Sequence, residues 1–486
     1  MRRRPKAAAA KSPHLLGGGG RGIGAASCAS SAVRVLLYSE NVSSFGDNRT
    51  YFLRKAHVPE LQKTSASIRV HPRPTPENPR CKVWLFFWPP SLLLRQGASV
   101  LYFGLLVGWR YLPRWLIRES VRSMPVAAGS IGMGCIGFPA HPAWEVTAAC
   151  NLHCIHCHAS GGRPAPDELT TAEAKRFIDD LADVREFRML VYTGGEPLVR
   201  PDVLELMDYS RRVGFANVIA TNATLIDDGV ARDLRRVGVV GAAVSLDAPS
   251  DQVHDFVRGS ARSYERAIEG MRALRRAGIL LQINVTAMKY NIDLLDELLA
   301  LSDALGSSIM LLYQLVPVGR GEKIAAASLD LTENEQLLRF LARKQRTIHP
   351  IVEPVAGPQY WPYLLERRGL QNGLWLRLAR PLFHGCSAGR GFVYIKPNGD
   401  VWPCPFVDVH CGNVREQPFR EIWQESPVFE DLRHRETRLK GKCGQCRYNG
   451  ICGGCRGRAL ALTGDYMAAD PTCFIGTDRE PASSGI

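Results

Sequence analysis

Between residues 144 and 315 the chain alternates short apolar runs with longer amphipathic ones. The short runs are rich in apolar residues along their whole length, which predicts strands buried on both faces. They are Trp144–Thr147, Met189–Thr193, Ala216–Ala220, Ala242–Leu246, Leu281–Thr286 and Ile309–Leu315. The longer runs repeat apolar residues at helical spacing. They are Thr171–Val184, Val203–Val213, Asp227–Val237, Tyr264–Ala277 and Ile292–Leu305.

Six strands, each followed by a helix or connector, predict a parallel sheet, because parallel strands need crossover connections and these are right-handed. Strands with near-continuous apolar character fit a sheet that helices cover. Six units, where a closed barrel has eight, predict an α/β fold with a partial (β/α)6 TIM-like barrel over residues 141–320. In such folds the active site lies at the carboxyl ends of the strands.

The chain after the barrel is predicted to contain a helical connector over residues 321–385, followed by a cysteine-rich domain over 386–476 and a tail over 477–486. Within the connector, Thr332–Arg346 reads as a helix that opens on a Thr cap, while Pro354–Pro362 has no clear pattern. In the cysteine-rich part, Phe392–Trp402 predicts a β-hairpin on an Asn-Gly turn.

Two segments precede the barrel. Residues 1–82 are basic and of low complexity, and disorder or an over-early start codon explains this better than an Arg-rich targeting peptide. Residues 83–140 form an apolar and amphipathic, helical region. Neither apolar run within 83–117 reaches the roughly 20 residues of a spanning helix. A helix on a membrane surface and a helix packed against the protein's own body both fit this stretch.

The distribution of charge argues against a nucleic-acid partner. The formal net charge is +14, and residues 1–80 hold 14 Lys and Arg against 4 Asp and Glu, which gives +10 of the total. The remaining residues therefore carry only +4. Basicity thus belongs to the N-terminal stretch and not to the barrel.

Cysteine usage indicates bound metal in a reducing compartment. Eleven of the 14 cysteines fall into two clusters at ligand-like spacing. The other three, Cys28, Cys81 and Cys135, belong to no motif and are interpreted as ordinary thiols. Metal-ligand thiolates favour a cytoplasmic enzyme over a secreted protein built on disulfides.

The first cluster of cysteines lies on one loop after the first predicted strand. Cys150, Cys154 and Cys157 follow a C-x3-C-x2-C spacing. A [4Fe–4S] cluster usually takes four thiolates, so three leave one iron without a protein ligand. This loop resembles that of the radical S-adenosylmethionine (SAM) enzymes. The resemblance implies a [4Fe–4S] cluster on these thiolates and SAM on its open iron.

Further motifs at the ends of later strands resemble the same family. Gly194, Gly195, Glu196 and Pro197 end the second strand, where backbone groups and a carboxylate are expected to accept the SAM ammonium. The resemblance also implies that His156 lies near the adenine and that Arg258 pairs with the methionine carboxylate. Polar residues at the ends of strands three and four complete the expected SAM contacts: Asn222, Ser245 and Asp247. Each of these residues singly also fits a turn or cap.

The second cluster of cysteines resembles the SPASM extension of radical SAM proteins, which holds auxiliary iron–sulfur clusters. Its last spacing, Cys452-x2-Cys455, departs from the more common x3. Eight cysteines suffice for two fully ligated [4Fe–4S] clusters. The family pattern implies Cys386, Cys404, Cys411 and Cys455 for one cluster, and Cys443, Cys446, Cys452 and Cys473 for the other. A four-thiolate zinc site is the alternative for paired C-x2-C units.

The resemblance implies a radical mechanism in which no side chain is assignable as catalytic. One electron splits SAM into methionine and a 5′-deoxyadenosyl radical, which removes a substrate hydrogen atom. The electron is expected from a reduced donor such as ferredoxin or flavodoxin. A non-enzymatic iron–sulfur carrier would not need the Gly194–Pro197 motif beside an incomplete cluster.

The substrate is expected to be a tetrapyrrole or a peptide. Over residues 141–476 the chain is closest in texture to the radical SAM proteins of heme biosynthesis, which alter carboxylate side chains of iron porphyrinoids. Arg320, Arg415, Arg456 and Arg458 are then expected to meet such carboxylates. A SPASM maturase of a ribosomally made peptide is the alternative, although residues 1–140 do not read as the usual peptide-binding region.

Overall fold

A computed structural model describes residues 101, 102, 104, 105, 108, 141–184, 187, 189–380 and 385–476. The expectations for 1–82, for nearly all of 83–140 and for the tail lie outside these residues. Within them, no helix has the length and apolar character that crossing a membrane requires. The fold below belongs to the unit of residues 71–486.

A ten-stranded sheet runs in the order β10-β9-β8-β1-β2-β3-β4-β5-β6-β7. From β8 to β7 all neighbours are parallel, and β8–β9 and β9–β10 are antiparallel. The strands are β1 (His141–Glu145), β2 (Met189–Thr193), β3 (Ala216–Thr221), β4 (Val239–Ser245), β5 (Leu280–Ala287), β6 (Ile309–Gln314), β7 (Ile351–Val355), β8 (Phe392–Ile395), β9 (Asp400–Trp402) and β10 (Gly412–Asn413). The sheet is not closed, which confirms the partial barrel.

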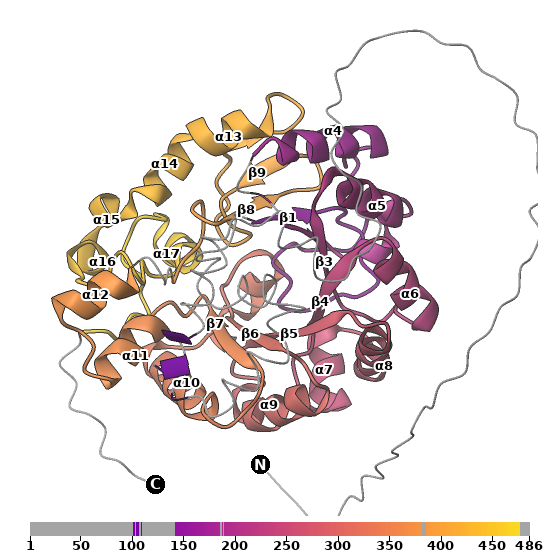
Figure 1. Cartoon of the computed structure of the whole chain (residues 1–486). Helices are drawn as coiled ribbons and strands as arrows, with labels where there is room; N and C mark the ends of the chain where they lie inside the picture. The colour runs from indigo at the N-terminus through magenta and orange to yellow at the C-terminus, as the bar shows by residue number, and fades with distance from the viewer. Residues whose placement is uncertain are drawn as a thin grey trace, which may run out of the picture. The chain divides into compact units, whose positions relative to one another are not determined.

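Helices cover the outer face of the barrel strands (Figure 1). In the barrel they are α4 (Thr171–Ala182), η1 (Pro197–Val199), α5 (Val203–Val213), α6 (Asp228–Arg236), α7 (Asp251–Arg258), α8 (Ser263–Arg276), η2 (Ile292–Leu294) and α9 (Leu295–Ala304). Those that follow are η3 (Gly319–Ala327), α10 (Leu331–Lys344), α11 (Tyr360–Arg367), α12 (Gly373–Ala379), α13 (Phe419–Glu425), α14 (Pro427–Arg433), α15 (Arg435–Arg438), α16 (Gly441–Gln445) and α17 (Arg456–Thr463).

The two faces of the barrel sheet differ in chemistry. Strand register places Ser245, Asn284, Leu311 and Glu353 in one row across β4 to β7. This row faces the barrel interior, because the adjacent row is fully buried in the core shared with the helices. That core row is Val244, Ile283, Met310 and Val352. The interior face is therefore partly polar.

The six predicted strands and the hairpin are all present, whereas three details of the prediction were wrong. The connector over 321–385 is not purely helical, because Ile351–Val355 adds β7 to the sheet edge. Helix α7 was not predicted. Helix α10 opens on Asp330 and not on Thr332, since the Asp330 carboxylate accepts the Glu333 N–H in a capping box. The predicted domain boundaries stay predictions.

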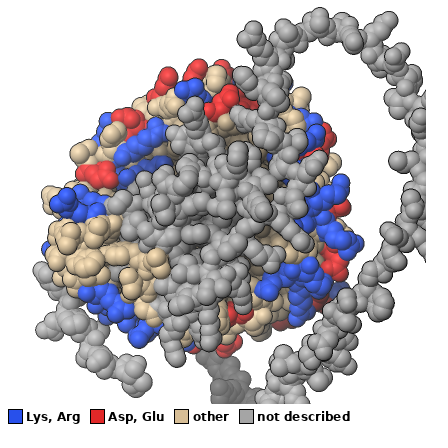
Figure 2. Space-filling view, viewed as in Figure 1, with Lys and Arg blue, Asp and Glu red and all other residues tan. Residues whose placement is uncertain are grey.

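The charges of the described residues are mixed in sign. On the face seen in Figure 2, Lys and Arg lie among Asp and Glu around the rim. Many of the described charged side chains form ion pairs, as Lys175 does with Glu205. Among the described residues seen on this face, the two signs are mixed, and they form no basic stripe of the kind that follows a phosphate backbone.

Candidate active site and iron–sulfur sites

The loop after β1 holds its three cysteines close together. The Cys150 N–H donates to the Gly162 carbonyl oxygen at 2.9 Å, which folds the loop back on itself. Burial raises the pKa of Cys150 to about 11, and the charges of Cys154 and Cys157 add to this rise. Three such thiols become thiolates when a cationic group binds them, as an iron–sulfur cluster requires. The donor set therefore fits the predicted cluster.

Arg320, in η3, binds this loop through three hydrogen bonds. Its Nε donates to the Cys154 carbonyl oxygen at 2.8 Å and its Nη1 to that of Gly161 at 2.7 Å. Its backbone N–H donates to the Cys157 carbonyl oxygen at 3.0 Å. Arg320 thus orients the cysteines, and it is not free to meet a substrate carboxylate as expected.

The Gly194–Pro197 motif packs directly on the cluster loop. The Gly195 N–H donates to the Thr147 carbonyl oxygen and the Glu196 N–H to that of Ala149, both at 2.8 Å. A Cβ on Gly195 would collide with the Ala149 carbonyl group. The glycines are needed because two backbones meet here without room for a side chain.

The Glu196 carboxylate does not point to an open ligand position. It accepts hydrogen bonds from Thr221 Oγ1 and the Asn222 N–H, each at 2.8 Å, and from the Leu198 N–H at 3.3 Å. Burial raises the pKa of Glu196 to about 7 against these three donors. Glu196 thus joins the ends of β2 and β3, and a contact of this carboxylate with the SAM ammonium stays a prediction.

Asn222 also forms a hydrogen bond with the cysteine loop. Its Nδ2 donates to Asn151 Oδ1 at 2.8 Å, and its Oδ1 accepts from the N–H and hydroxyl of Thr224. Ser245, at the end of β4, is half-buried on the interior face. Both residues thus lie at the carboxyl ends of their strands. Asn222 lies beside the cysteine loop, and Ser245 lies on the barrel wall.

A buried charged group lies beside Cys154. Arg258 Nη2 pairs with Asp247 Oδ2 at 2.7 Å, and Arg258 Nη1 donates to Cys154 Sγ at 3.7 Å. His156 Nε2 is 3.9 Å from the same carboxylate oxygen. Burial lowers the pKa of His156 to about 4, so the ring is neutral at pH 7. Arg258 Nε and His156 Nδ1 are buried and have no hydrogen-bond partner, and such orphaned atoms fit a polar ligand held beside the cluster.

One auxiliary set of cysteines lines a single pocket: Cys443, Cys446, Cys452 and Cys473. Backbone N–H groups point at their sulfur atoms, from Tyr448 to Cys446 and from Gly454 to Cys452 at 3.4 Å. In the described part of the chain, no three His, Cys, Asp or Glu side chains converge as one metal ion needs. The four thiols line a shared space instead, and N–H···S contacts are typical of iron–sulfur ligands.

In the other set, three of the four predicted thiols lie close enough for their charges to act on one another. Burial raises the pKa of Cys404 well above its usual range, and the charges of Cys386 and Cys455 raise it further. The thiol of Cys411 instead lies 3.6 Å from the Val409 carbonyl oxygen, with Ser426 as a further partner. The place of Cys411 in this set stays a prediction.

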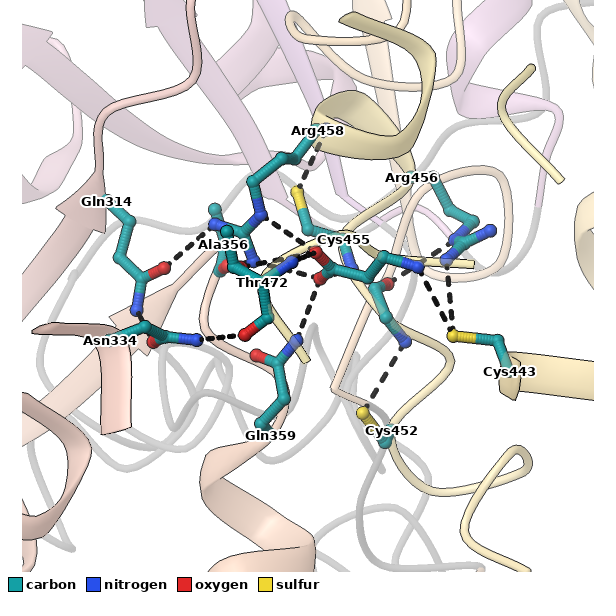
Figure 3. A network of polar contacts seen from close by, with 12 residues as sticks. Gln314, Asn334, Ala356, Gln359, Cys443, Cys452, Cys455, Arg456, Arg458 and Thr472 are labelled. Atoms are coloured by element: carbon teal, nitrogen blue, oxygen red, sulfur yellow. Dashed lines mark hydrogen bonds and ion pairs between the residues drawn. The ribbon is translucent and has the colours of Figure 1, made fainter. Parts of the chain in front are cut away.

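The other three arginines that were expected to meet substrate carboxylates also bind protein groups. Arg415 donates to Glu173 on the surface. Arg456 donates to the carbonyl oxygens of Tyr466 and Ala468 at 2.8 and 2.7 Å, and Arg458 pairs with Asp470 at 2.8 Å (Figure 3). The expectation that they meet substrate carboxylates is therefore not met.

Comparisons with known proteins agree with this site. Residues 144–301 match the family model of the radical SAM superfamily, and residues 386–447 match SPASM, an iron–sulfur cluster-binding domain. The AdoMet-dependent heme synthase of Methanosarcina barkeri is 38% identical over 336 residues, which cover 68% of this chain and 95% of that protein. That of Oleidesulfovibrio alaskensis is 35% identical and is covered to 88%.

Two other known proteins are similar to this chain at lower sequence identity. The mycofactocin maturase MftC of Mycobacterium tuberculosis is 32% identical, with 70% of this chain and 83% of that protein covered. The crystal structure of Streptococcus suis SuiB with its precursor peptide SuiA shares the fold, with a TM-score of 0.56 and 19% identity. That match covers 74% of this chain and 81% of SuiB.

A three-thiol loop at the carboxyl end of β1, with the glycine motif packed on it, defines an enzyme that uses SAM and a [4Fe–4S] cluster. The chain belongs to the radical SAM superfamily and has a SPASM domain for auxiliary iron–sulfur clusters. The zinc alternative is thereby set aside.

Proposed function

We propose that this radical SAM enzyme oxidatively decarboxylates carboxylate side chains of an iron porphyrinoid in heme-type cofactor biosynthesis. The observation that carries the proposal is the similarity to AdoMet-dependent heme synthases, since this chain covers 95% of the length of the M. barkeri protein. Removal of one hydrogen atom from a propionate, followed by release of CO2 and one electron, leaves a vinyl group. Such a reaction needs a radical, a one-electron acceptor and a carboxylate site.

Bound SAM and the [4Fe–4S] cluster supply a 5′-deoxyadenosyl radical, and the auxiliary clusters supply one-electron transfer. Cys150, Cys154 and Cys157 hold the first cluster in this proposal. Arg258 Nε and His156 Nδ1, which lack protein partners, orient the polar groups of SAM. Asp247 keeps Arg258 charged and in place through their 2.7 Å ion pair.

We assign the substrate site to the part of the barrel wall on β8 that lies between the SAM-site cysteines and the auxiliary cysteines. Burial raises the pKa of Tyr394 on β8 well above its usual range, and the charges of Glu145, Cys157 and Cys404 raise it further, so Tyr394 lies near both groups of thiols. His158 Nε2 is 3.4 Å from the Tyr394 hydroxyl. Lys396 Nζ pairs with Glu145 at 2.6 Å on the same strand pair. We assign Lys396 and Tyr394 to substrate carboxylate binding, because the Lys396 side chain lies over the Tyr394 ring and stays partly exposed while its partner Glu145 is buried.

Anaerobic incubation with SAM, a reductant and iron porphyrinoids that bear propionates, followed by mass spectrometry, tests the proposal. The expected result is 5′-deoxyadenosine together with loss of CO2 mass from one porphyrinoid. Loss from none of them, with 5′-deoxyadenosine still formed, would reject the substrate. Reconstituted enzyme should hold about twelve irons, as three [4Fe–4S] clusters.

Lys396→Met is expected to raise the KM for the porphyrinoid by about tenfold, since a hydrogen bond to a charged group contributes about 1.5–3 kcal/mol. Lys175→Met, which changes an exposed lysine of α4, is the control. An unchanged KM in Lys396→Met would remove Lys396 from the substrate site.

A peptide maturase is the second candidate, and the similarity to MftC favours it. It predicts that a short precursor peptide, and no porphyrinoid, loses mass in the same assay. Genes for siroheme-derived tetrapyrroles or for a precursor peptide beside the coding gene also separate the two. In either case we assign electron supply to ferredoxin or flavodoxin and the enzyme to the cytoplasm, where thiolates stay reduced. Membrane association through residues 83–117 stays a prediction.

A further inference from the structure

Arg435 is a buried cation whose hydrogen-bonding groups are only partly satisfied. It begins α15, and its residue is 1% exposed. Its Nη1 donates to the Cys386 carbonyl oxygen, whereas Nε and Nη2 are buried without a hydrogen-bond partner. The adjacent acidic residue, Glu436, pairs with Arg390 at 3.3 Å. Burial and the Arg390 charge lower the pKa of Arg435 to about 10, so it remains a cation at pH 7.

The guanidinium of Arg435 lies between the two auxiliary sets of thiols. It packs against Gly453, where an added Cβ would lie 2.5 Å from the guanidinium carbon. Gly453 follows Cys452 of one set and precedes Cys455 of the other. The charges of Cys386 and Cys452, one from each set, both act on Arg435. The short Cys452-x2-Cys455 spacing, which departs from the family pattern, thus holds a glycine that makes room for this side chain.

Two other buried arginines of this region, Arg456 and Arg458, are satisfied by protein groups. Arg458 pairs with Asp470 and donates to the Gln314 side chain at 2.8 Å. Arg456 donates to two carbonyl oxygens and, through Nη2, to Cys443 Sγ at 3.9 Å. Thiol sulfur therefore already accepts from a guanidinium here (Figure 3). A buried guanidinium with two unpartnered nitrogens is costly unless acceptors and negative charge are supplied.

We propose that Arg435 is the shared counter-charge of the two auxiliary iron–sulfur sites, with its two unpartnered nitrogens, Nε and Nη2, directed at the sulfur atoms of the bound clusters. The proposal rests on the iron–sulfur assignment of these sites and not on the substrate. Reduction adds negative charge to a cluster, and a nearby cation stabilises the reduced form. Arg435 therefore raises the reduction potentials of both auxiliary clusters.

A redox titration of the reconstituted full chain, followed by electron paramagnetic resonance, tests this proposal without any porphyrinoid. The variants are Arg435→Gln and Arg435→Lys, and the control is Arg438→Gln, which removes a half-exposed cation from the same short helix. Added SAM identifies the signal of the Cys150–Cys157 cluster. The expected result for Arg435→Gln is a shift of both auxiliary midpoint potentials to more negative values, with no shift of the SAM-binding cluster.

Iron content decides the remaining outcomes. Full iron in Arg435→Gln with unshifted auxiliary potentials overturns the proposal. Loss of auxiliary iron in Arg435→Gln, with full iron and near wild-type potentials in Arg435→Lys, supports it, because lysine keeps the charge. Loss of auxiliary iron in both variants overturns it, because the residue then acts through packing and not through charge. Arg438→Gln is expected to match wild type throughout.

Discussion

At the residue scale, Gly194 and Gly195 are required for contact between two backbones. Gly194 has φ near +144°, and a Cβ there would strike the Thr147 carbonyl group. Gly195 meets Ala149 in the same way. The motif thus fixes how closely the end of β2 approaches the cysteine loop, which sets where any ligand of both can lie.

Gly195→Ala is expected to lower 5′-deoxyadenosine formation at least about tenfold, since overpacking costs about 1–3 kcal/mol. The control is Gly162→Ala on the same loop, where an added Cβ has open space. Product is quantified after incubation with SAM and reductant. Equal losses in both variants would contradict this account of the motif.

Glu353 is a second informative residue, because it is a buried acid on the barrel interior. Its Oε1 has no hydrogen-bond partner, and burial raises the pKa of Glu353 well above its usual range. The folded state thus binds this proton more tightly than the unfolded state does. Its contribution to stability is fully present below pH about 4 and is lost as pH rises through the folded pKa.

Glu353→Gln keeps the size of the side chain and removes its titration. The melting temperature of wild type is expected to fall more steeply than that of the variant between pH about 5 and about 8. Glu205→Gln, at a half-exposed site, serves as the control. Parallel melting curves for wild type and Glu353→Gln across this range would show that Glu353 is not protonated in the fold.

At the element scale, local signals decided where helices begin. The amphipathic pattern of α10 was visible in the sequence, but the predicted cap was Thr332. In the structure Asp330 has extended backbone and accepts the Glu333 N–H at 2.8 Å, while the Glu333 carboxylate accepts the Asp330 N–H at 2.8 Å. Thr332 is already inside the helix.

Asp330→Ala is expected to reduce the free energy of unfolding by about 1 kcal/mol, because it removes the N-cap acceptor. Thr332→Ala should cost less, as it leaves the capping box intact. Thermal unfolding of cluster-loaded protein measures both. A larger loss of stability for Thr332→Ala than for Asp330→Ala would show that Thr332 is the N-cap, as the sequence predicted.

At the scale of the whole molecule, a buried polar network joins the barrel to the SPASM domain (Figure 3). Arg458 on α17 reaches Gln314 on β6 at 2.8 Å, and Gln314 donates to Asn334 on α10 at 2.6 Å. Asp470 accepts from the Cys455 N–H at 2.8 Å, and its own N–H donates to Cys443 Sγ at 3.5 Å. The network therefore touches one cysteine of each auxiliary set.

Asp470→Asn is expected to destabilise the protein by about 3–5 kcal/mol, because it leaves the Arg458 charge buried and unpaired. Asp465→Asn, which changes a carboxylate paired with Lys440 on the surface, should have an effect under about 1 kcal/mol. Unfolding is followed by tryptophan fluorescence in denaturant. Similar midpoints for the two variants would mean that the network does not hold the domains together.

Much of the architecture could be predicted because its signals are local. Runs of apolar residues marked six strands to within a few residues, and cysteine spacing marked both groups of thiols. Strand β7 was not predicted, because Ile351–Val355 contains a proline and a glutamate and becomes a strand only beside β6. Residues such as Arg320 and Arg458 were assigned to the substrate, since sequence does not show which internal acceptors an arginine will find.

The sequence by itself determined the open barrel, the three-thiol loop with its glycine motif, and the class of chemistry. The barrel and the loop follow from periodicity and spacing, which act over a few residues, and the class of chemistry was implied by the resemblance to radical SAM enzymes. Only the tertiary structure decided that Glu196 joins the ends of two strands, that the four arginines donate to protein groups, and that Arg435 lies between two sets of cysteines. Those outcomes depend on contacts between residues far apart in the chain, where burial leaves each charge with whichever partner the fold brings to it.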